Sequence, residues 1–305
     1  MSVYCIIVTY NAMKWVERCL SSLHTSSIPV VPVVVDNQSS DETVDFITSH
    51  YPEVIVLPQD KNLGFGQANN IGIIHALRQG ASHLLLLNQD AAISSDTIDK
   101  LLACDDGKHL LTPIHLNGDG EHIDANFYSK TIIGSCDSHT LIEDLLIHKN
   151  LQAFYPVRYV NAACWLLPKA VITTVGGFNP LFFQYGEDDN YINRLNYYHF
   201  GARMVIDAFI FHDREKHGNE DIYLRGALYR QLLINRTNIN LTHKERIFMH
   251  HKICLQELGR SLQKHYFTLC TREVISATHK LLWQSKVIRQ SRYIETNINN
   301  AWLNL

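Results

Sequence analysis

Two polar side chains close an apolar run near residue 90, and together they could bind a divalent cation. Residues 84–87 are four consecutive leucines, and Asn88 and Asp90 follow them. A spacing of two places both side chains on the same side of an extended segment, and amide and carboxylate oxygens are hard ligands. Taken alone, however, the stretch is more typical of an ordinary junction between a strand and a loop.

Three adjacent carboxyl groups, on Glu187, Asp188 and Asp189, form a second candidate site. A helical pattern follows them, and the helix dipole stabilises acids in a first turn, which is a purely structural explanation. Crowding of like charges also raises the pKa of a carboxyl group toward the range that suits a general base. The residue types therefore allow both a structural and a catalytic interpretation.

Aromatic residues accompany these acids. Trp165 and Tyr185 could stack on the faces of sugars or belong to the core, and the pattern favours a core position for Phe183. An aromatic wall beside a carboxyl group would provide a surface for a saccharide next to a base.

Polar groups end other apolar runs as well. Asp36 could accept hydrogen bonds from a ribose or a base, or cap the turn that follows it. Asn62 and Asn70 could hold a nucleotide or cap a helix. His212 follows the last apolar run, where a solvated loop histidine is the commoner case; the company of Asp90 makes a metal ligand more plausible.

The elements that would position these groups alternate along the first ninety residues. Residues 3–9, 28–35, 54–57 and 83–88 predict strands, and helical patterns lie between them. This order implies an α/β fold with a parallel, doubly wound sheet, whose strands end at one ligand-binding edge. A dinucleotide-binding domain is disfavoured because residues 9–12, after the first strand, contain no glycine.

The rest of the chain is less regular. Residues 105–158 predict an insertion or an acceptor-side region, and strands are predicted at 159–167 and 203–211. From about residue 220 the pattern is helical, with one apolar face predicted from Ile247, Cys254, Leu255, Leu258 and Leu262. Such helices could lie on an anionic membrane, pack on the preceding domain or form a homodimer.

Composition indicates a soluble globular protein, since 46% of the 305 residues are apolar and 19% are charged. The charge is uneven: residues 1–242 hold 17 Lys and Arg against 26 Asp and Glu, whereas residues 243–305 hold 10 against 4. Seven cysteines without a CxxC pair predict reduced thiols and a cytoplasmic location. No signal peptide or membrane-spanning run is apparent, and no motif for nucleic-acid binding accompanies the basic end.

Five ordered stretches resemble family 2 glycosyltransferases, and within that family the rhamnosyltransferase-like members, with galactofuranosyltransferases as more distant relatives. The stretches lie at 6–11 (IIVTYN), 33–41 (VVVDNQSSD), 62–72 (NLGFGQANNIG), 87–90 (LNQD) and 177–188 (GFNPLFFQYGED). Each is short, but their order and spacing match the family across residues 3–215.

The resemblance implies a GT-A fold, Rossmann-like with a mostly parallel central sheet, a nucleotide-sugar donor and a Mg²⁺ or Mn²⁺ ion. It implies that Asp90 and His212 bind the metal and that Asp188 is the catalytic base of an inverting transfer. Asn88 stands where the family has the first acid of its DxD motif. The implied donor-binding residues are Thr9, Tyr10, Asn11, Asp36, Asn62, Gly64, Asn70 and Asn88, and the candidate acceptor-binding residues are Trp165, Tyr185 and Glu187.

We therefore expect a transferase domain at residues 1–218 and a helical C-terminal region at 219–305. The expected reaction moves rhamnose from dTDP-rhamnose to a saccharide or lipid-linked saccharide in bacterial cell-surface polysaccharide synthesis. The expected location is the cytoplasm, or the inner face of the membrane as a peripheral protein. Two alternatives remain: a UDP-galactose or UDP-galactofuranose donor, or a non-catalytic protein that binds nucleotide sugars or acts as a scaffold.

Overall fold

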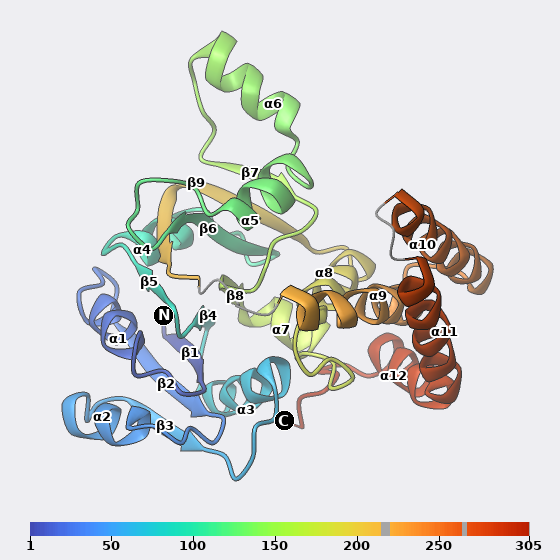
Figure 1. The fold of residues 1–305 in the computed structure, drawn as a ribbon. Helices are drawn as coiled ribbons and strands as arrows, with labels where there is room; N and C mark the ends of the chain where they lie inside the picture. Colours follow the sequence, from blue (N-terminus) through green and yellow to red (C-terminus); the bar gives the residue numbers. More distant parts are fainter. Residues whose placement is uncertain (215–219, 264–266, 305) are drawn as a thin grey trace.

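One mixed sheet crosses the molecule, in a computed structural model that describes all residues except 215–219, 264–266 and 305 (Figure 1). Within the described residues nine strands join it, in the order β3-β2-β1-β4-β8-β6-β9-β5, and β7 pairs with β9. The strands are β1 (Val3–Thr9), β2 (Val30–Asp36), β3 (Ile55–Pro58), β4 (His83–Asn88), β5 (Ala91–Ile93), β6 (His109–Asn117), β7 (Phe154–Val157), β8 (Cys164–Pro168) and β9 (Gly201–His212).

Helices cover both faces of this sheet and continue beyond it. The α-helices are α1 (Val16–His24), α2 (Thr43–His50), α3 (Phe65–Arg78), α4 (Thr97–Ala103), α5 (Ala125–Phe127), α6 (Ser138–Glu143), α7 (Lys169–Val175), α8 (Glu187–Tyr197), α9 (Glu220–Thr237), α10 (His243–Gln263), α11 (Phe267–Trp283) and α12 (Ser285–Asn297). Two π-helical turns, η1 (Tyr128–Ile133) and η2 (Asp144–His148), flank α6.

The N-terminal half of the sheet is parallel, as the repeated strand and helix pattern predicts. Strands β1, β2, β3 and β4 all run in one direction, and Val3 of β1 lies opposite both Val30 and His83. Alternate side chains point to opposite faces: Leu84 and Leu86 pack in the apolar cluster that includes α3, α7 and α8, and Leu85 and Leu87 pack in the cluster that includes α1, α2 and α4. The leucine run is therefore a buried central strand, as predicted.

The C-terminal half of the sheet differs from the expectation in two places. Strand β8 runs antiparallel to β4, and it begins only at Cys164, so residues 159–163 form a loop rather than part of the predicted strand. Residues 105–158 supply β6, which pairs with β8 and β9 inside the sheet, as well as the edge strand β7. This region is thus part of the sheet itself, and only its stretch around α6 projects from the body (Figure 1).

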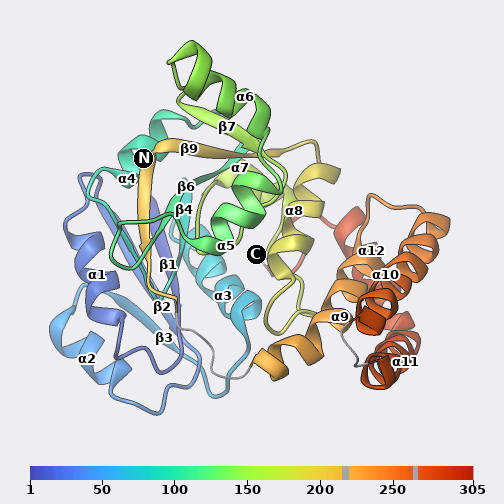
Figure 2. The same ribbon diagram turned by 45° about the horizontal axis from the view of Figure 1, so that its top comes forward.

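The C-terminal helices lie to one side of the sheet (Figures 1 and 2) and are joined to it by a buried ion pair. Nε of Arg194 on α8 lies 3.6 Å from Oε1 of Glu295 on α12, and both side chains are at most 1% exposed. The same Glu295 oxygen accepts a hydrogen bond of 2.7 Å from Asn179, and Arg194 donates to the carbonyls of Val175 and Gly177. Helix α12 is therefore attached to the loop that precedes α8 as well as to α8.

Glu295→Gln should destabilise the protein strongly, because it leaves the Arg194 guanidinium buried without its counter-charge. We expect a loss of about 3–5 kcal/mol in the free energy of unfolding, measured by urea denaturation. The control is Glu257→Gln, since Glu257 pairs with Arg260 at 2.5 Å on the surface of α10 and should contribute less than about 1 kcal/mol. Equal, small losses in both variants would contradict a structural role for the buried pair.

Candidate active site

The carboxyl ends of β1 and β2 meet at one edge of the sheet, where Thr9 lies opposite Asp36. The Thr9 hydroxyl donates to Oδ1 of Asp36 at 2.8 Å, and Ser39 donates to both carboxylate oxygens, through its hydroxyl at 2.6 Å and its amide at 2.9 Å. Asp36 is 2% exposed. Its carboxylate therefore caps the following turn, as the structural alternative predicts. A nucleotide sugar that contacted Asp36 would compete with these three hydrogen bonds.

Hydrogen bonds fix the backbone of the loop after β1 beside this edge. The amide of Tyr10 donates to the side chain of Gln89 at 2.8 Å, which ties the ends of β1 and β4 together. The amide of Asn11 donates to the hydroxyl of Ser39, and the Asn11 side chain accepts from the amide of Ser40. Because these bonds fix the backbone, the ring of Tyr10 stays 49% exposed and available to a ligand.

The loop from β3 to α3 has a mainly structural role in this geometry. Gly64 has a φ of +79°, and a Cβ there would lie 2.0 Å from the carbonyl oxygen of Phe183, so a glycine is required. Asn62 accepts a hydrogen bond from the amide of Gly64. Asn70 is 6% exposed and bonds both the amide and the carbonyl of Phe178. These bonds use the Asn70 amide group within the core, so a structural role accounts for this residue without a donor.

Asp90 and His212 come together, although 122 positions separate them in the sequence. Strands β5 and β9 pair with Ala91 opposite His212, which brings Oδ1 of Asp90 to 3.3 Å from Nε2 of His212. The His212 side chain is 2% exposed and that of Asp90 is 22% exposed. These two atoms converge where β4 and β9 end.

A divalent cation would find few protein ligands at this point. Among the described residues no group of three or more His, Cys, Asp or Glu side chains is arranged to hold a metal. Asp90 and His212 still fit a cation that takes its other ligands from a diphosphate and water, since Mg²⁺ is commonly bound by one or two carboxylates plus substrate phosphates. The backbone amide of Asn88 donates to the carbonyl of Ala163 at 2.9 Å, so Asn88 lies where the loop 159–163 meets β4.

The three carboxyl groups occupy the first turn of α8, after Gly186 in the left-handed region with a φ of +94°. Burial, together with the charge of Asp188, raises the pKa of Glu187 to about 8 and that of Asp189 to about 7. Glu187 and Asp189 are therefore not both fully ionised at neutral pH. Glu187 is only 5% exposed, so little of its surface can contact an acceptor saccharide. Among the described residues, its Oε2 has no hydrogen-bond partner.

Tyr159 is a site residue that the sequence did not single out. Its hydroxyl donates to Oδ2 of Asp188 at 3.0 Å, and burial together with the nearby carboxylates raises the pKa of Tyr159. Lys130 of η1 lies over the Tyr159 ring, with its Nζ 5.9 Å from the centroid. No sequence signal pairs Tyr159 with Asp188, because the sequence predicts Tyr159 as the first residue of a strand.

The aromatic predictions are partly wrong. Trp165 is completely buried and stacks on Phe178, so its side chain cannot contact an acceptor. Phe183, predicted in the core, is 56% exposed, and its carbonyl accepts a hydrogen bond from the amide of Phe65 at 3.1 Å. Tyr185, which is separated from the acids by Gly186, has a positive φ of 67°, and the Arg230 guanidinium lies over its ring.

Solved structures with the same fold include proteins in complex with UDP or UDP-GlcNAc. S. aureus TarS 1-349 in complex with UDP-GlcNAc has a TM-score of 0.58 at 16% sequence identity, over 97% of this chain and 86% of that one. GalNAc-T7 with UDP, GalNAc and Mn²⁺ has a TM-score of 0.56 at 14% identity, over 87% of this chain and 58% of that one. The chain spans only 43% of a longer TarS chain. At these identities the likeness concerns the fold, and it confirms the predicted GT-A-like architecture.

Sequence relatives agree with the motifs. Residues 4–109 match the family model described as glycosyl transferase family 2. The chain is 25% identical over 231 residues to the N-acetylglucosaminyl-diphospho-decaprenol L-rhamnosyltransferase of Mycobacterium tuberculosis, covering 68% of this chain and 75% of that protein. It is 29% identical over 124 residues to the dTDP-rhamnosyl transferase RfbF of Shigella flexneri, covering 40% and 41%. The predicted resemblance is thus confirmed: this chain is similar to family 2 glycosyltransferases and, among them, to rhamnosyltransferases.

Proposed function

We propose that this chain transfers rhamnose from dTDP-rhamnose to a saccharide or lipid-linked saccharide, with inversion at the anomeric carbon, in bacterial cell-surface polysaccharide synthesis. The observation that carries the proposal is the arrangement of Asp188. Tyr159 holds its carboxylate, and the loop that bears Tyr159 is bonded to the end of β4, two residues before Asp90. The names of the two relatives support the donor and a polyprenyl-linked acceptor.

The donor would lie along the edge formed by the ends of β1, β2 and β4. Tyr10 offers an exposed ring, and Thr9, Asn11, Asp36 and Asn88 border the same edge. Asp90 and His212 would hold Mg²⁺ or Mn²⁺ there, and the bound ion would act as a Lewis acid that stabilises charge on the departing diphosphate. Asn88 in place of an acid leaves that ion dependent on the donor's own phosphate oxygens.

Asp188 would accept the proton of the attacking acceptor hydroxyl. A single base suffices for an inverting transfer, because the hydroxyl displaces the diphosphate directly and no covalent intermediate forms. The raised pKa values of Glu187 and Asp189 limit the negative charge around this base at neutral pH. The Tyr159 hydroxyl fixes Oδ2 of Asp188, and the backbone amide of Asp189 donates to Oδ1 at 2.9 Å. The acceptor hydroxyl would use the remaining lone pairs of this carboxylate, and Tyr159 is a positioning residue.

Residues 1–218 would form the transferase domain and 219–305 a helical region that contacts a membrane or a second copy. Among the described helices, none combines the length and the apolar character needed to cross a bilayer. A cytoplasmic protein that reaches a lipid-linked acceptor at the inner face of the membrane fits this proposal.

Asp188→Asn should reduce turnover by about 10²- to 10⁴-fold, because the amide cannot accept the proton. Donor binding, measured by calorimetry, should remain unchanged, since the side-chain volume is preserved. The matched control is Asp189→Asn, which we expect to lose less than about tenfold. A non-catalytic nucleotide-sugar binding protein would show no transfer in the wild type and no difference between the variants.

Calorimetric titration with dTDP, UDP and GDP, each with and without Mn²⁺, identifies the donor class. We expect dTDP to bind most tightly, with an affinity that falls at least about tenfold when Mn²⁺ is omitted or when Asp90 is changed to Ala. Preference for UDP would instead favour the galactose or galactofuranose donor. Absence of binding by every nucleotide would contradict the donor site.

Tyr159→Phe should lower kcat by about tenfold, because one hydrogen bond to a charged group is lost while the ring remains in place. The dissociation constant of the donor should stay the same. If Tyr159 served stability alone, the melting temperature would fall and kcat of the folded protein would not, and that result would contradict a positioning role.

A further inference from the structure

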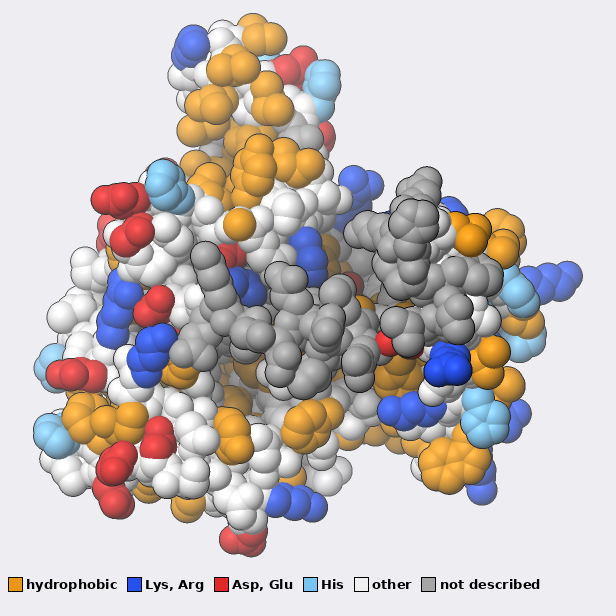
Figure 3. All heavy atoms as spheres, viewed as in Figure 1, with side chains coloured by type: hydrophobic (Ala, Val, Ile, Leu, Met, Phe, Trp, Pro, Cys, Tyr) orange, Lys and Arg blue, Asp and Glu red, His pale blue; other side chains and the backbone are white. Residues whose placement is uncertain are grey.

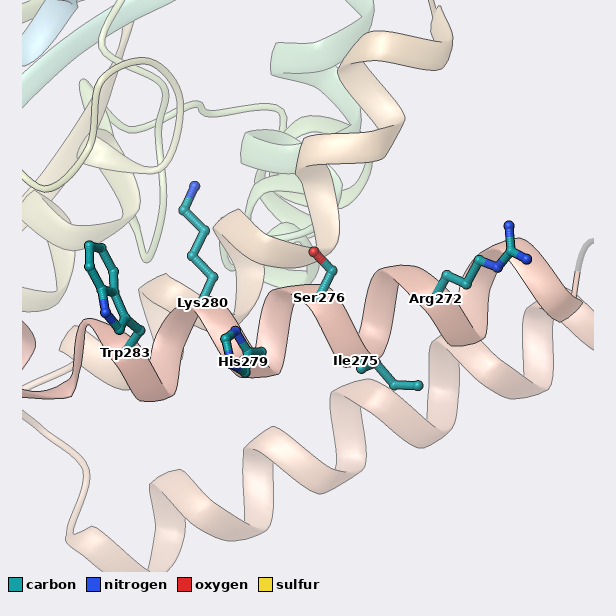
Figure 4. Close-up of a pocket in the computed structure, with 6 residues that line it drawn as sticks. All are labelled: Arg272, Ile275, Ser276, His279, Lys280 and Trp283. Carbon is teal, nitrogen blue, oxygen red and sulfur yellow. The ribbon is translucent and has the colours of Figure 1, made fainter.

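One outward face of the C-terminal helices combines basic and apolar side chains. Along α11 the exposed positions recur at helical spacing and line one shallow hollow (Figure 4). We name these six residues the α11 face: Arg272, Ile275, Ser276, His279, Lys280 and Trp283. Figure 4 shows that Arg272, Ser276, Lys280 and Trp283 project to the same side of the helix.

Large apolar side chains are unusually exposed here. Trp283 is 83% exposed, Leu282 is 61% exposed and Ile275 is 64% exposed. On α10, Leu255 is 68% and Leu262 60% exposed, whereas Cys254 is 9% exposed, so the apolar face predicted from the sequence is divided between core and surface. An exposed tryptophan is favoured at the interface between a polar and an apolar phase, because its ring packs in the apolar phase while its N–H reaches polar groups.

The charge around these residues has one sign. Among the side chains of residues 243–305 whose exposure the structure describes, one acid is exposed, Glu245, against seven bases. The exposed bases are Lys244, Lys252, Arg260, Arg272, Lys280, Lys286 and Arg289. Figure 3 shows basic, histidine and apolar side chains intermixed at this side of the molecule. A partner with negative charge and an apolar interior complements this surface.

We infer that the α11 face docks on an anionic membrane surface, with Trp283 in the headgroup region and the bases against acidic lipid headgroups. An amphipathic helix with basic residues and a tryptophan is the usual element for such contact. The inference extends the proposed function, because it gives a soluble transferase a place to meet a lipid-linked acceptor.

The same observations disfavour other occupants. A two-fold symmetric dimer through the α11 face would bring two copies of the same basic surface together, and their like charges would repel. Nucleic acid would meet the charge but would leave Ile275, Leu282 and Trp283 without an apolar partner, since protein–nucleic acid interfaces are polar and wet.

Cosedimentation of the full chain with vesicles tests the inference without any sugar transfer. Vesicles of equal parts phosphatidylcholine and phosphatidylglycerol should bind the protein, phosphatidylcholine alone should bind it far less, and added salt should weaken binding. Trp283→Ala should lower the partition coefficient at least about tenfold. Arg272→Gln and Lys286→Gln should each lower it about fivefold, which is the effect of one base near a charged surface.

The matched control is Ile147→Ser on η2, a residue 69% exposed on the projecting stretch around α6 and outside the basic surface. This variant should bind vesicles like the wild type. Equal binding to both vesicle types, equal loss in the Ile147 variant, a dimer in sedimentation that Trp283→Ala abolishes, or preferential binding of duplex DNA would each overturn the inference. Calorimetry with dTDP on the same variants separates this failure from a failure of the donor site, since none of them changes a residue placed there.

Discussion

The buried guanidinium of Arg194 sets the arrangement on which the candidate active site depends. A buried guanidinium needs hydrogen-bond acceptors in place of water. For Arg194 these are Glu295 of α12, Asn190 on its own helix, and the carbonyls of Val175 and Gly177. One side chain thus joins α8, the loop before it and the last helix of the chain. Because the carboxyl groups lie in the first turn of α8, their position is determined partly by residues more than a hundred positions away.

Satisfaction of hydrogen bonds separates the structural polar groups from those left for a ligand. Asp36 and Asn70 look functional in the sequence, yet partners within the protein take up their polar atoms. By contrast, within the described residues the Asp90 carboxylate pairs with His212, and each oxygen of Asp188 accepts one bond, from Tyr159 and from the amide of Asp189, which leaves lone pairs unused. Buried polar groups are normally paired, so groups with unused capacity at a sheet edge are the better candidates for binding and catalysis.

Local patterns predicted the fold well because its first half is built from local rules. The runs that become β1 to β4 are apolar over the length of one strand each, and parallel crossovers then place their ends together. The features that the sequence did not reveal concern residues whose position depends on distant contacts. Asn70 bonds Phe178 from 108 positions away, Trp165 is enclosed by residues of several elements, and Tyr159 reaches Asp188 only because the expected strand begins later. The mixed composition of residues 105–158 also did not predict that β6 lies inside the sheet.

A membrane contact at α11 would have a mechanical consequence for the site. Helix α11 packs on α9 and α12, and α12 is fixed to α8 by the Arg194 and Glu295 pair. The acids of α8 would therefore keep a constant position relative to the membrane surface, without any flexible connection between α12 and α8. A lipid-linked acceptor has one end anchored in the same surface, so the reach of its saccharide would decide which hydroxyl arrives at Asp188. Acceptor length, rather than recognition of each sugar alone, would then contribute to specificity.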